Sequence, residues 1–289
     1  MTERLLPPGN RAPVRAIAGL DALDPPAKKL GKAIRGLIPQ GPVKDALSGS
    51  WLGHTLHPLL TDVTIGTFMS AVMLDWLGGE RSRPAAERLI GLGLLSAVPT
   101  VSSGYSDWAD TEVASDSARR IGIVHAAANA TAASLFAASW SARRRGGGGR
   151  LLALAGGGTM AAAAYLGGHL TLAEGVGVDH TAFEDAVEEW TSVLDDGELG
   201  DGQMRCVEAD GTTVMIARAQ GSLYALSNHC SHRGGPLHEG ELGDLTVTCP
   251  WHHSVFDLRD GALVHGPAAY PQPAWDVRAR VGRIEVRRR

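Results

Sequence analysis

The sequence predicts a multidomain protein in which an all-α four-helix transmembrane bundle precedes a small all-β domain of antiparallel strands. Four apolar stretches, each near the ~20 residues that cross ~30 Å of hydrocarbon, occupy the middle of the chain. Short runs rich in β-branched residues, separated by glycine, follow them. The chain of 289 residues has room for about two domains of ordinary size.

The composition excludes several classes of protein. Hydrophobic residues make up 44% of the chain and charged residues 20%, which is ordinary for a folded protein and argues against disorder. A net charge of −4 removes the electrostatic case for nucleic acid as a partner. Three cysteines are too few for a disulfide-stapled secreted module.

Residues 1–53 are expected to form a basic N-terminal segment. Asp24 followed by Pro25 and Pro26 predicts a helix start, with an N-cap and then prolines where no N–H is needed. Apolar side chains recur at helical spacing over residues 30–38, with basic side chains beside them. This pattern predicts an amphipathic helix on a membrane surface, or alternatively a solvated surface helix.

Residues 54–173 are expected to form the four-helix transmembrane domain, in contact with membrane lipid. Its apolar stretches are residues 57–77, 89–108, 121–140 and 151–173. They are rich in Gly, Ala, Ser and Thr, which let helices approach closely in lipid, and tryptophans lie at their ends as in an interfacial belt. A soluble four-helix bundle is the alternative, but the stretches lack the polar face that such a bundle shows to water.

The expected location is a bacterial cell membrane that the chain crosses several times. Four crossings return the chain to its starting side, so the N-terminal segment and the β domain share that side. The basic N-terminal segment favours the cytoplasm for this side, whereas arginines in the two opposite loops favour the reverse. The sequence therefore leaves the compartment open.

Four polar residues of the apolar stretches form a candidate site near one membrane surface. They are His57, His125, His169 and, about one helical turn deeper, Asp62. Ionisable residues are costly inside a membrane and are usually functional there. Two of the histidines are expected to ligate a b-type haem, to accept a proton from a quinol, or to hold a metal. The alternative is that they form hydrogen bonds to neighbouring helices or headgroups.

An acidic linker, residues 174–190, precedes the β domain, which is expected over residues 191–289. Asp-Gly pairs at 210–211 and 260–261 predict hairpin turns between its short strands. Cys206 is expected in a buried strand of this domain.

Two short loops of the β domain contain residues that bind metals. One holds Cys230 and His232 in a C-x-H pattern, and the other holds Cys249 and His252 in a C-x2-H pattern. A [2Fe–2S] cluster with two thiolates on one iron and two imidazoles on the other needs one cysteine and one histidine from each loop. Zinc fingers instead pair cysteine with cysteine and histidine with histidine, and a zinc site is the alternative.

The β domain resembles the Rieske iron–sulfur domain. The resemblance rests on residues 228–237, 249–257 and 266–268, which contain both loops and a proline loop. It implies a [2Fe–2S] cluster, with the two cysteines on the inner iron and the two histidines on the outer iron. The region from 54 to 179 resembles a bacterial four-helix membrane family of unknown function. That second resemblance rests on residues 57–59, 107–108, His125 with Asn129, 165–169 and 175–178.

The β domain departs from the Rieske proteins of cytochrome bc-type complexes. Those proteins carry an additional cysteine in each loop, joined as a disulfide, where this sequence has Gly235 and Trp251. The resemblance also implies that Ser254, Trp251 and Pro267 surround and tune the cluster. Phe256 stands where a tyrosine hydroxyl would donate a hydrogen bond to sulfur. We therefore expect a potential toward the low end of the Rieske range of about −150 to +300 mV.

The resemblance implies a membrane-anchored Rieske protein that carries single electrons between a redox donor and an acceptor, either a protein or a quinol. It implies an electron-transfer component rather than a self-contained catalyst, because the chain lacks room for the mononuclear iron domain of ring-hydroxylating oxygenases. Two alternatives stay open. One is the ferredoxin component of an oxygenase or nitrite-reductase system, with the helices only as an anchor. The other is a redox or iron–sulfur sensor without electron flux.

Overall fold

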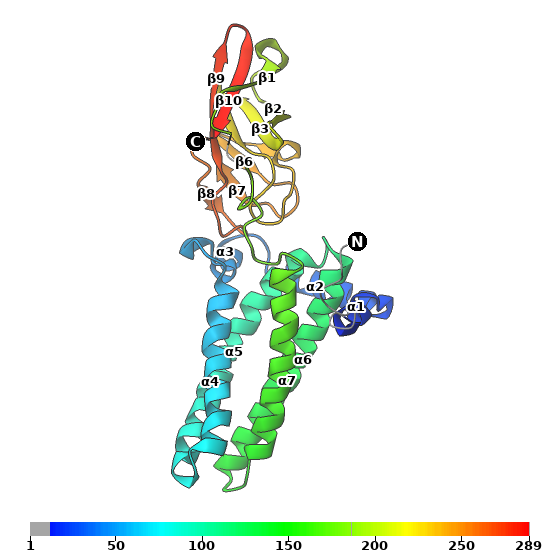
Figure 1. The fold of residues 1–289 in the computed structure, drawn as a ribbon, viewed down its shortest axis with the longest axis vertical. Coiled ribbons are helices and arrows are strands. Elements are labelled where there is room, and N and C mark those ends of the chain that lie inside the picture. Colours follow the sequence, from blue (N-terminus) through cyan, green and yellow to red (C-terminus); the bar gives the residue numbers. More distant parts are fainter. Residues whose placement is uncertain (1–11, 186, 289) are drawn as a thin grey trace, which may run out of the picture. The chain divides into compact units, whose positions relative to one another are not determined.

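The computed structural model describes residues 12–185 and 187–288 (Figure 1). The chain forms two compact units. The helical unit contains the residues up to 38 together with residues 56–176, and the β unit contains residues 39–55 together with residues 177–289. The segment 39–55, which lies in the N-terminal part of the sequence, therefore belongs to the β unit.

The described part of the helical unit consists of four long helices and several shorter ones. Their bounds are α1 Ala12–Ala18, η2 Asp21–Leu23, α2 Asp24–Leu37, α4 Leu56–Leu77, η4 Glu80–Ser82, α5 Arg83–Thr111, α6 Asp116–Arg144 and α7 Arg150–Leu172. Helix α4 packs along α5, and α6 packs along α7 (Figure 1). The all-α class expected for this part of the chain is confirmed, with short helices beside the four long ones.

Three stretches of the helical unit are long and apolar enough to cross a membrane. They are Glu80–Thr111, Asp116–Arg144 and Arg150–Leu172. Within the described ranges α4 is not among them. The expected class of long apolar helices is therefore confirmed, but three of them qualify as membrane-crossing where four were expected.

Small residues let the long helices approach one another. Phe68 of α4 stacks on Phe136 of α6, with ring centroids 4.0 Å apart. A Cβ on Gly93 of α5 would lie 2.6 Å from the Phe68 ring, and a Cβ on Gly156 of α7 would lie 3.1 Å from the Phe136 ring. A side chain at Gly93 would force the Phe68 ring to move, and one at Gly156 would press on the Phe136 ring. Close approach of this kind is the packing that small residues provide in membrane helix bundles.

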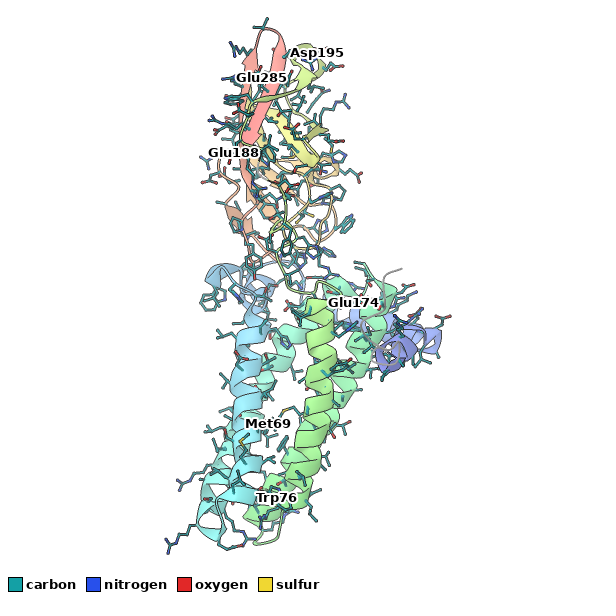
Figure 2. The ribbon with its side chains drawn as sticks, viewed as in Figure 1. Met69, Trp76, Glu174, Glu188, Asp195 and Glu285 are labelled. Carbon is teal, nitrogen blue, oxygen red and sulfur yellow. The ribbon has the colours of Figure 1, made fainter. Side chains whose placement is uncertain are left out.

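One end of the helical unit has the composition of a membrane interface. Trp76 lies at the end of α4 (Figure 2), and the guanidinium carbon of Arg150 lies 5.1 Å from the centre of its ring. The guanidinium carbon of Arg144 lies 5.0 Å from the centre of the Trp140 ring. Tryptophans are enriched where helices meet the headgroup region, and long arginine side chains reach toward that region from helix ends.

Helix α2 packs against the long helices. Its buried residues Ala27 and Ile34 contact Trp108 of α5. Asp24 lies within the first turn rather than at the N-cap, and its carboxylate accepts a hydrogen bond from Arg120 at 2.8 Å. The apolar face expected to meet a membrane surface or solvent is thus partly covered by protein, with Ile34 buried and Leu37 exposed. The N-cap expected at Asp24 is replaced by an ion pair with α6.

The β unit contains two antiparallel sheets and a few short helices. The described elements are α3 Pro42–Ser48, η3 Ser50–Leu52, β1 Thr191–Asp195, η5 Asp196–Glu198, β2 Gln203–Ala209, β3 Thr212–Ala219, β4 Ser222–Ser227, η6 Leu237–Glu239, β5 Glu241–Leu242, β6 Thr246–Thr248, β7 Val255–Asp257, β8 Leu263–His265, β9 Ala274–Arg280 and β10 Arg283–Arg288. One sheet has the strand order β1-β10-β9-β4-β3-β2, and the other has the order β5-β6-β7-β8. The expected antiparallel all-β class is confirmed.

The predicted hairpin turns are present. Asp210 and Gly211 join β2 to β3 with φ angles of 47° and 85°, the two positive values that a tight hairpin turn requires. Gly261 has φ 75° in the turn from β7 to β8. Cys206 is exposed on β2, so the expectation of a buried strand position was wrong. The reason is that β2 is an edge strand of its sheet, where middle residues face solvent.

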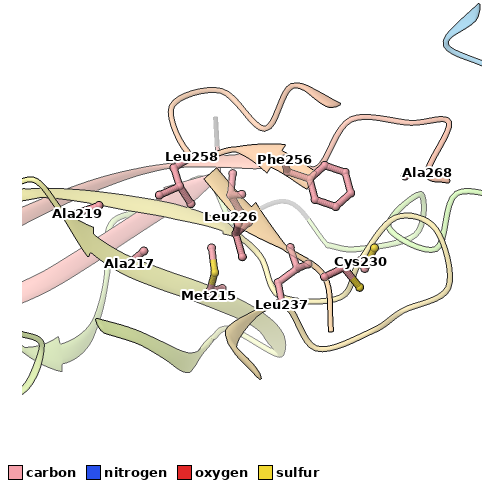
Figure 3. Packing of buried hydrophobic residues seen from close by; sticks show 11 residues of the cluster. Met215, Ala217, Ala219, Leu226, Cys230, Leu237, Phe256, Leu258 and Ala268 are labelled. Carbon is pink, nitrogen blue, oxygen red and sulfur yellow. The ribbon is translucent and has the colours of Figure 1, made fainter. Parts of the chain in front are cut away.

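A buried apolar cluster reaches the loops that carry the candidate ligands. Met215 of β3 and Leu226 of β4 pack with Phe256 of β7 and with Leu258 (Figure 3). Cys230 belongs to the same cluster and lies toward its edge (Figure 3). The core of the β unit therefore supports the first ligand loop directly.

Candidate metal centre

Two loops hold the four candidate ligands. The first loop follows β4 and the second follows β6. The backbone N–H of Cys230 donates to the carbonyl oxygen of Gly235 at 2.9 Å, and that of Cys249 donates to the carbonyl oxygen of Ser254 at 2.8 Å. Each loop is thus closed by its own backbone hydrogen bond, and both cysteines are buried.

The loops bring the ligands together as two pairs. The Cys230 thiol donates a hydrogen bond to the sulfur of Cys249. The rings of His232 and His252 lie 5.0 Å apart between centroids, at an interplanar angle of 86°. Each loop therefore contributes one member of the thiol pair and one member of the imidazole pair.

Hydrogen bonds and burial set the protonation of these side chains. The hydrogen bond from Cys230 lowers the pKa of Cys249, and the backbone N–H groups of Trp251 and His252 act in the same direction. The same thiol hydrogen bond, together with burial, raises the pKa of Cys230 well above its usual value. Burial lowers the pKa of His232 well below its usual value, which keeps the ring neutral. Thiolate and neutral imidazole are the forms that bind metals.

The grouping of donors matches the needs of a mixed-ligand [2Fe–2S] cluster, in which each iron takes two side chains. A thiol pair and an imidazole pair fit the needs of two irons.

Gly235 and Trp251 join the two loops at a close contact. A Cβ on Gly235 would lie 2.9 Å from the Sγ of Cys249 and 3.1 Å from the Cγ of Trp251. These are the two positions at which the bc-type Rieske proteins carry their disulfide, and the cysteines of this chain are all free. The indole of Trp251 thus packs against the backbone of Gly235, and this contact holds the two loops together without a covalent bond.

The remaining residues expected to tune the centre lie around the second loop. The Oγ of Ser254 accepts a hydrogen bond from the backbone N–H of Ala268 at 2.9 Å, which ties this loop to the proline loop. Pro267 follows a cis peptide bond in that loop, and Phe256 is fully buried. His253, beside a candidate ligand, is exposed and has φ 59°, a conformation that favours glycine.

Gln272 supports the first ligand loop, although no sequence pattern predicts this role. Its side chain is buried, and its Nε2 donates to the carbonyl oxygens of Ser227 and His229, both at 2.7 Å. Its Oε1 accepts from the backbone N–H of Ser231 at 2.9 Å. The amide side chain therefore holds the first ligand loop. No local sequence pattern indicates this role of Gln272. The one feature that could have drawn attention to it is its position between Pro271 and Pro273.

Two histidines of the helical unit hydrogen-bond to neighbouring helices. The Nδ1 of His57 lies 2.9 Å from the carbonyl oxygen of Thr100. The Nδ1 of His125 lies 2.8 Å from the carbonyl oxygen of Ala163, and the Nδ2 of Asn129 lies 3.1 Å from the Nε2 of the same ring. These contacts join α4 to α5 and α6 to α7.

The other two residues of that candidate site point elsewhere. The Nε2 of His169 lies 3.7 Å from a carboxylate oxygen of Glu174, and Asp62 is exposed on α4. In the part of the chain that the structure describes, the four side chains do not gather as ligands of one metal ion. A joint metal site of His57, His125, His169 and Asp62 therefore has no support in the described residues.

Comparisons with known proteins agree with this architecture. Residues 189–276 match the family described as Rieske [2Fe-2S] domain, and residues 53–180 match the family described as Predicted membrane protein (DUF2231). The 3-phenylpropionate/cinnamic acid dioxygenase ferredoxin subunit of Photorhabdus laumondii is 34% identical over 90 residues, which are 31% of this chain and 85% of that protein. The fold and the two loops thus define an iron–sulfur protein of the Rieske class. The chain belongs to the Rieske [2Fe–2S] domain family, fused to a membrane domain of the second family.

Two further relatives cover the same part of the chain. Apoptosis-inducing factor 3 of Mus musculus is 32% identical over 90 residues, which are 31% of this chain and only 15% of that protein. The ferredoxin of carbazole 1,9a-dioxygenase from Nocardioides aromaticivorans IC177 is 33% identical. Its structure covers 35% of this chain and 100% of that chain, with a TM-score of 0.34.

Proposed function

We propose that this protein is a membrane-bound carrier of single electrons between a redox donor and an acceptor. The main support is the arrangement of two buried cysteines and two histidines, one of each from each loop, in a domain of the Rieske family. The helical unit keeps this domain at a lipid bilayer, and three of its stretches have the length and apolarity that this requires.

The chain's own residues define the chemical environment. A bound [2Fe–2S] cluster supplies a one-electron redox couple. Cys230 and Cys249 would hold one iron of such a cluster, and His232 and His252 would hold the other. Backbone N–H groups that donate to the cysteine sulfurs stabilise added negative charge and raise the potential. Phe256 adds no hydroxyl donor, which keeps the potential toward the low end of the range of about −150 to +300 mV.

A ferredoxin component of an oxygenase or reductase system is the second candidate. It is favoured by the relative from Photorhabdus laumondii, which is by name the ferredoxin subunit of a dioxygenase. In that case the helices serve only as an anchor, and the partners are redox proteins. Rapid reduction by a flavin-dependent reductase favours this candidate, whereas reduction by a quinol favours a carrier that takes electrons from the membrane.

The histidines of the helical unit suit a quinol as electron donor better than they suit the ligation of a haem. His57 uses Nδ1 for its contact with Thr100, which leaves Nε2 to accept a proton from a quinol. Both ring nitrogens of His125 already have partners, Ala163 and Asn129, so neither is available to an iron. A haem band in the optical spectrum of the purified protein would contradict this choice, and reduction of the cluster by a quinol would support it.

Electron paramagnetic resonance of the dithionite-reduced protein in membranes tests the proposal. We expect the spectrum of a mixed-ligand [2Fe–2S] cluster, and we expect its loss in the His252→Ala variant because one iron loses a ligand. The matched control is His253→Asn, which changes the exposed neighbouring histidine to a residue that tolerates positive φ. An unchanged spectrum in His252→Ala, or no iron signal in the unmodified protein, would overturn the proposal.

A further inference from the structure

The segment 39–55 belongs to the β unit although it is far from the rest of that unit in the sequence. Most of it lies outside both matched regions, which cover residues 189–276 and 53–180. It consists of helix α3, the short helix η3 and the residues around them. This chain therefore adds a segment of its own to the Rieske domain.

The beginning and the middle of the segment bind the second ligand loop and the proline loop. The Nε2 of Gln40 donates a hydrogen bond to the carbonyl oxygen of His252 at 3.0 Å. The carboxylate of Asp45 accepts a hydrogen bond from the backbone N–H of Gly266 at 2.9 Å and lies 3.2 Å from the ring of His265. The segment thus contacts a candidate ligand of the outer iron directly.

The end of the segment fits closely against the proline loop. The Oγ of Ser50 donates to the carbonyl oxygen of Ala268 at 2.7 Å. A Cβ on Gly266 would lie only 2.1 Å from that Oγ. Bulk added at either position would therefore push the segment away from the loop.

Lys44 lies between these attachment points and is only 3% exposed. Lysine is rarely buried to this extent, because its charge must leave water. Lys44 lies in α3 between Gln40, which bonds the carbonyl oxygen of His252, and Asp45, which bonds the backbone N–H of Gly266. These contacts hold the buried lysine beside the second ligand loop and the proline loop.

We propose that the segment 39–55 forms an additional wall of the iron–sulfur site and positions Lys44 there to raise the reduction potential. The inference rests on the proposed function. Reduction adds one electron to the site, and a buried positive charge nearby stabilises that added negative charge. The segment keeps the charge in place through its contacts with the second ligand loop and the proline loop. Lys44 is a positioning residue in this account, because it acts on the site without ligating iron.

Redox titration of the purified full-length protein, followed by electron paramagnetic resonance, tests this inference. We expect Lys44→Gln to shift the ratio of reduced to oxidised protein about tenfold toward the oxidised form at a fixed potential. Tenfold corresponds to 59 mV for a one-electron couple. Lys44→Arg keeps the charge and should keep the potential, while Lys29→Gln removes the same charge from an exposed site in α2 and should change nothing.

A neutral variant separates the docking of the segment from its charge. Ser50→Val removes the hydrogen bond to Ala268 and adds bulk at the close contact, with all charges intact. It should lower the potential in the same direction as Lys44→Gln. An unchanged potential in either variant, with the spectrum of the cluster present, would overturn the inference. Absence of that spectrum from the unmodified protein would instead overturn the proposed function.

Discussion

At the scale of single residues, Gly235 shows how closely the two ligand loops approach. The positions around it leave no room for a side chain, because a Cβ would meet both the Cys249 sulfur and the Trp251 indole. A covalent link is absent, since the cysteines are free. The distance between the loops therefore depends on van der Waals packing alone at this point.

We expect Gly235→Ala to lower the free energy of unfolding by about 1–3 kcal/mol, the usual cost of overpacking. The added methyl group must move a cysteine or the indole, so we also expect less bound iron per protein. Urea unfolding and iron analysis measure the two effects. The control is Gly197→Ala, which has open space around its Cβ position and should change stability little. Equal effects of both substitutions would contradict this account.

The buried carboxylate of Glu184 predicts a pH-dependent stability for the β unit. Burial raises the pKa of Glu184, although Ser227 donates a hydrogen bond to its carboxylate and Arg288 lies 3.7 Å away. An acid whose pKa is higher in the folded state stabilises the fold fully below its unfolded pKa. That contribution is lost as the pH rises through the folded pKa.

Glu184→Gln should therefore remove part of the decrease in stability that occurs as the pH rises above about 4.3, the ordinary pKa of glutamate. The expected result is a difference in the free energy of unfolding between variant and unmodified protein that grows with pH until Glu184 is ionised. Urea unfolding at several pH values measures it. A difference that is independent of pH would show that the burial of Glu184 does not control this effect.

At the scale of elements, the loop between β8 and β9 supports the first ligand loop, and the side chain of Gln272 makes three of its contacts. Gln272 satisfies three backbone groups of the segment from Ser227 to Ser231. Buried backbone groups that lose their partners cost free energy, because no water replaces the lost hydrogen bond. The position of the first loop therefore depends on an element that follows it in the chain by forty residues or so.

We expect Gln272→Leu to lower the free energy of unfolding by about 3 kcal/mol, since three backbone groups lose a buried partner. The first ligand loop should also become mobile, which hydrogen exchange of the amide of Ser231 reports. The matched control is Gln203→Leu at the start of β2, where the glutamine is exposed and bonds only Gly200. Equal losses of stability in the two variants would contradict the role assigned to Gln272.

At the scale of the whole molecule, the chain forms two units with different means of stabilisation. The helical unit depends on close packing of small residues and rings between long helices. The β unit has one apolar cluster on its six-stranded sheet and a second that joins both sheets, and the candidate metal centre lies at the second. The binding of iron stabilises only the unit that binds it.

Removal of iron should therefore affect the two units differently. We expect treatment with a reductant and a chelator to lower the unfolding temperature of the β unit and to leave that of the helical unit unchanged. Circular dichroism in detergent separates the two, because the helical signal comes mainly from α4 to α7. An equal shift of both transitions, or no shift at all, would contradict the assignment of the metal to the β unit.

The antiparallel class of the β unit and its hairpin turns follow from local sequence. Asp210 and Gly211 adopt the positive φ angles expected of an Asp-Gly turn, because few other pairs tolerate them. Each ligand loop also brings together a cysteine and a histidine that are close neighbours in sequence, so the candidate ligand set was predictable. The exposure of Cys206 was not predictable, because burial at a strand position depends on which strand lies at the edge of the sheet.

The sequence by itself determined the two kinds of unit, the long apolar helices and the pairing of one cysteine with one histidine in each loop. All of these depend on residues a few positions apart, where spacing and propensity act directly. Only the tertiary structure decided that α2 packs on α5, that Gln272 supports the first loop, and that the segment 39–55 joins the β unit. Those contacts join residues far apart in the chain, and their free energy depends on surfaces that exist only after folding.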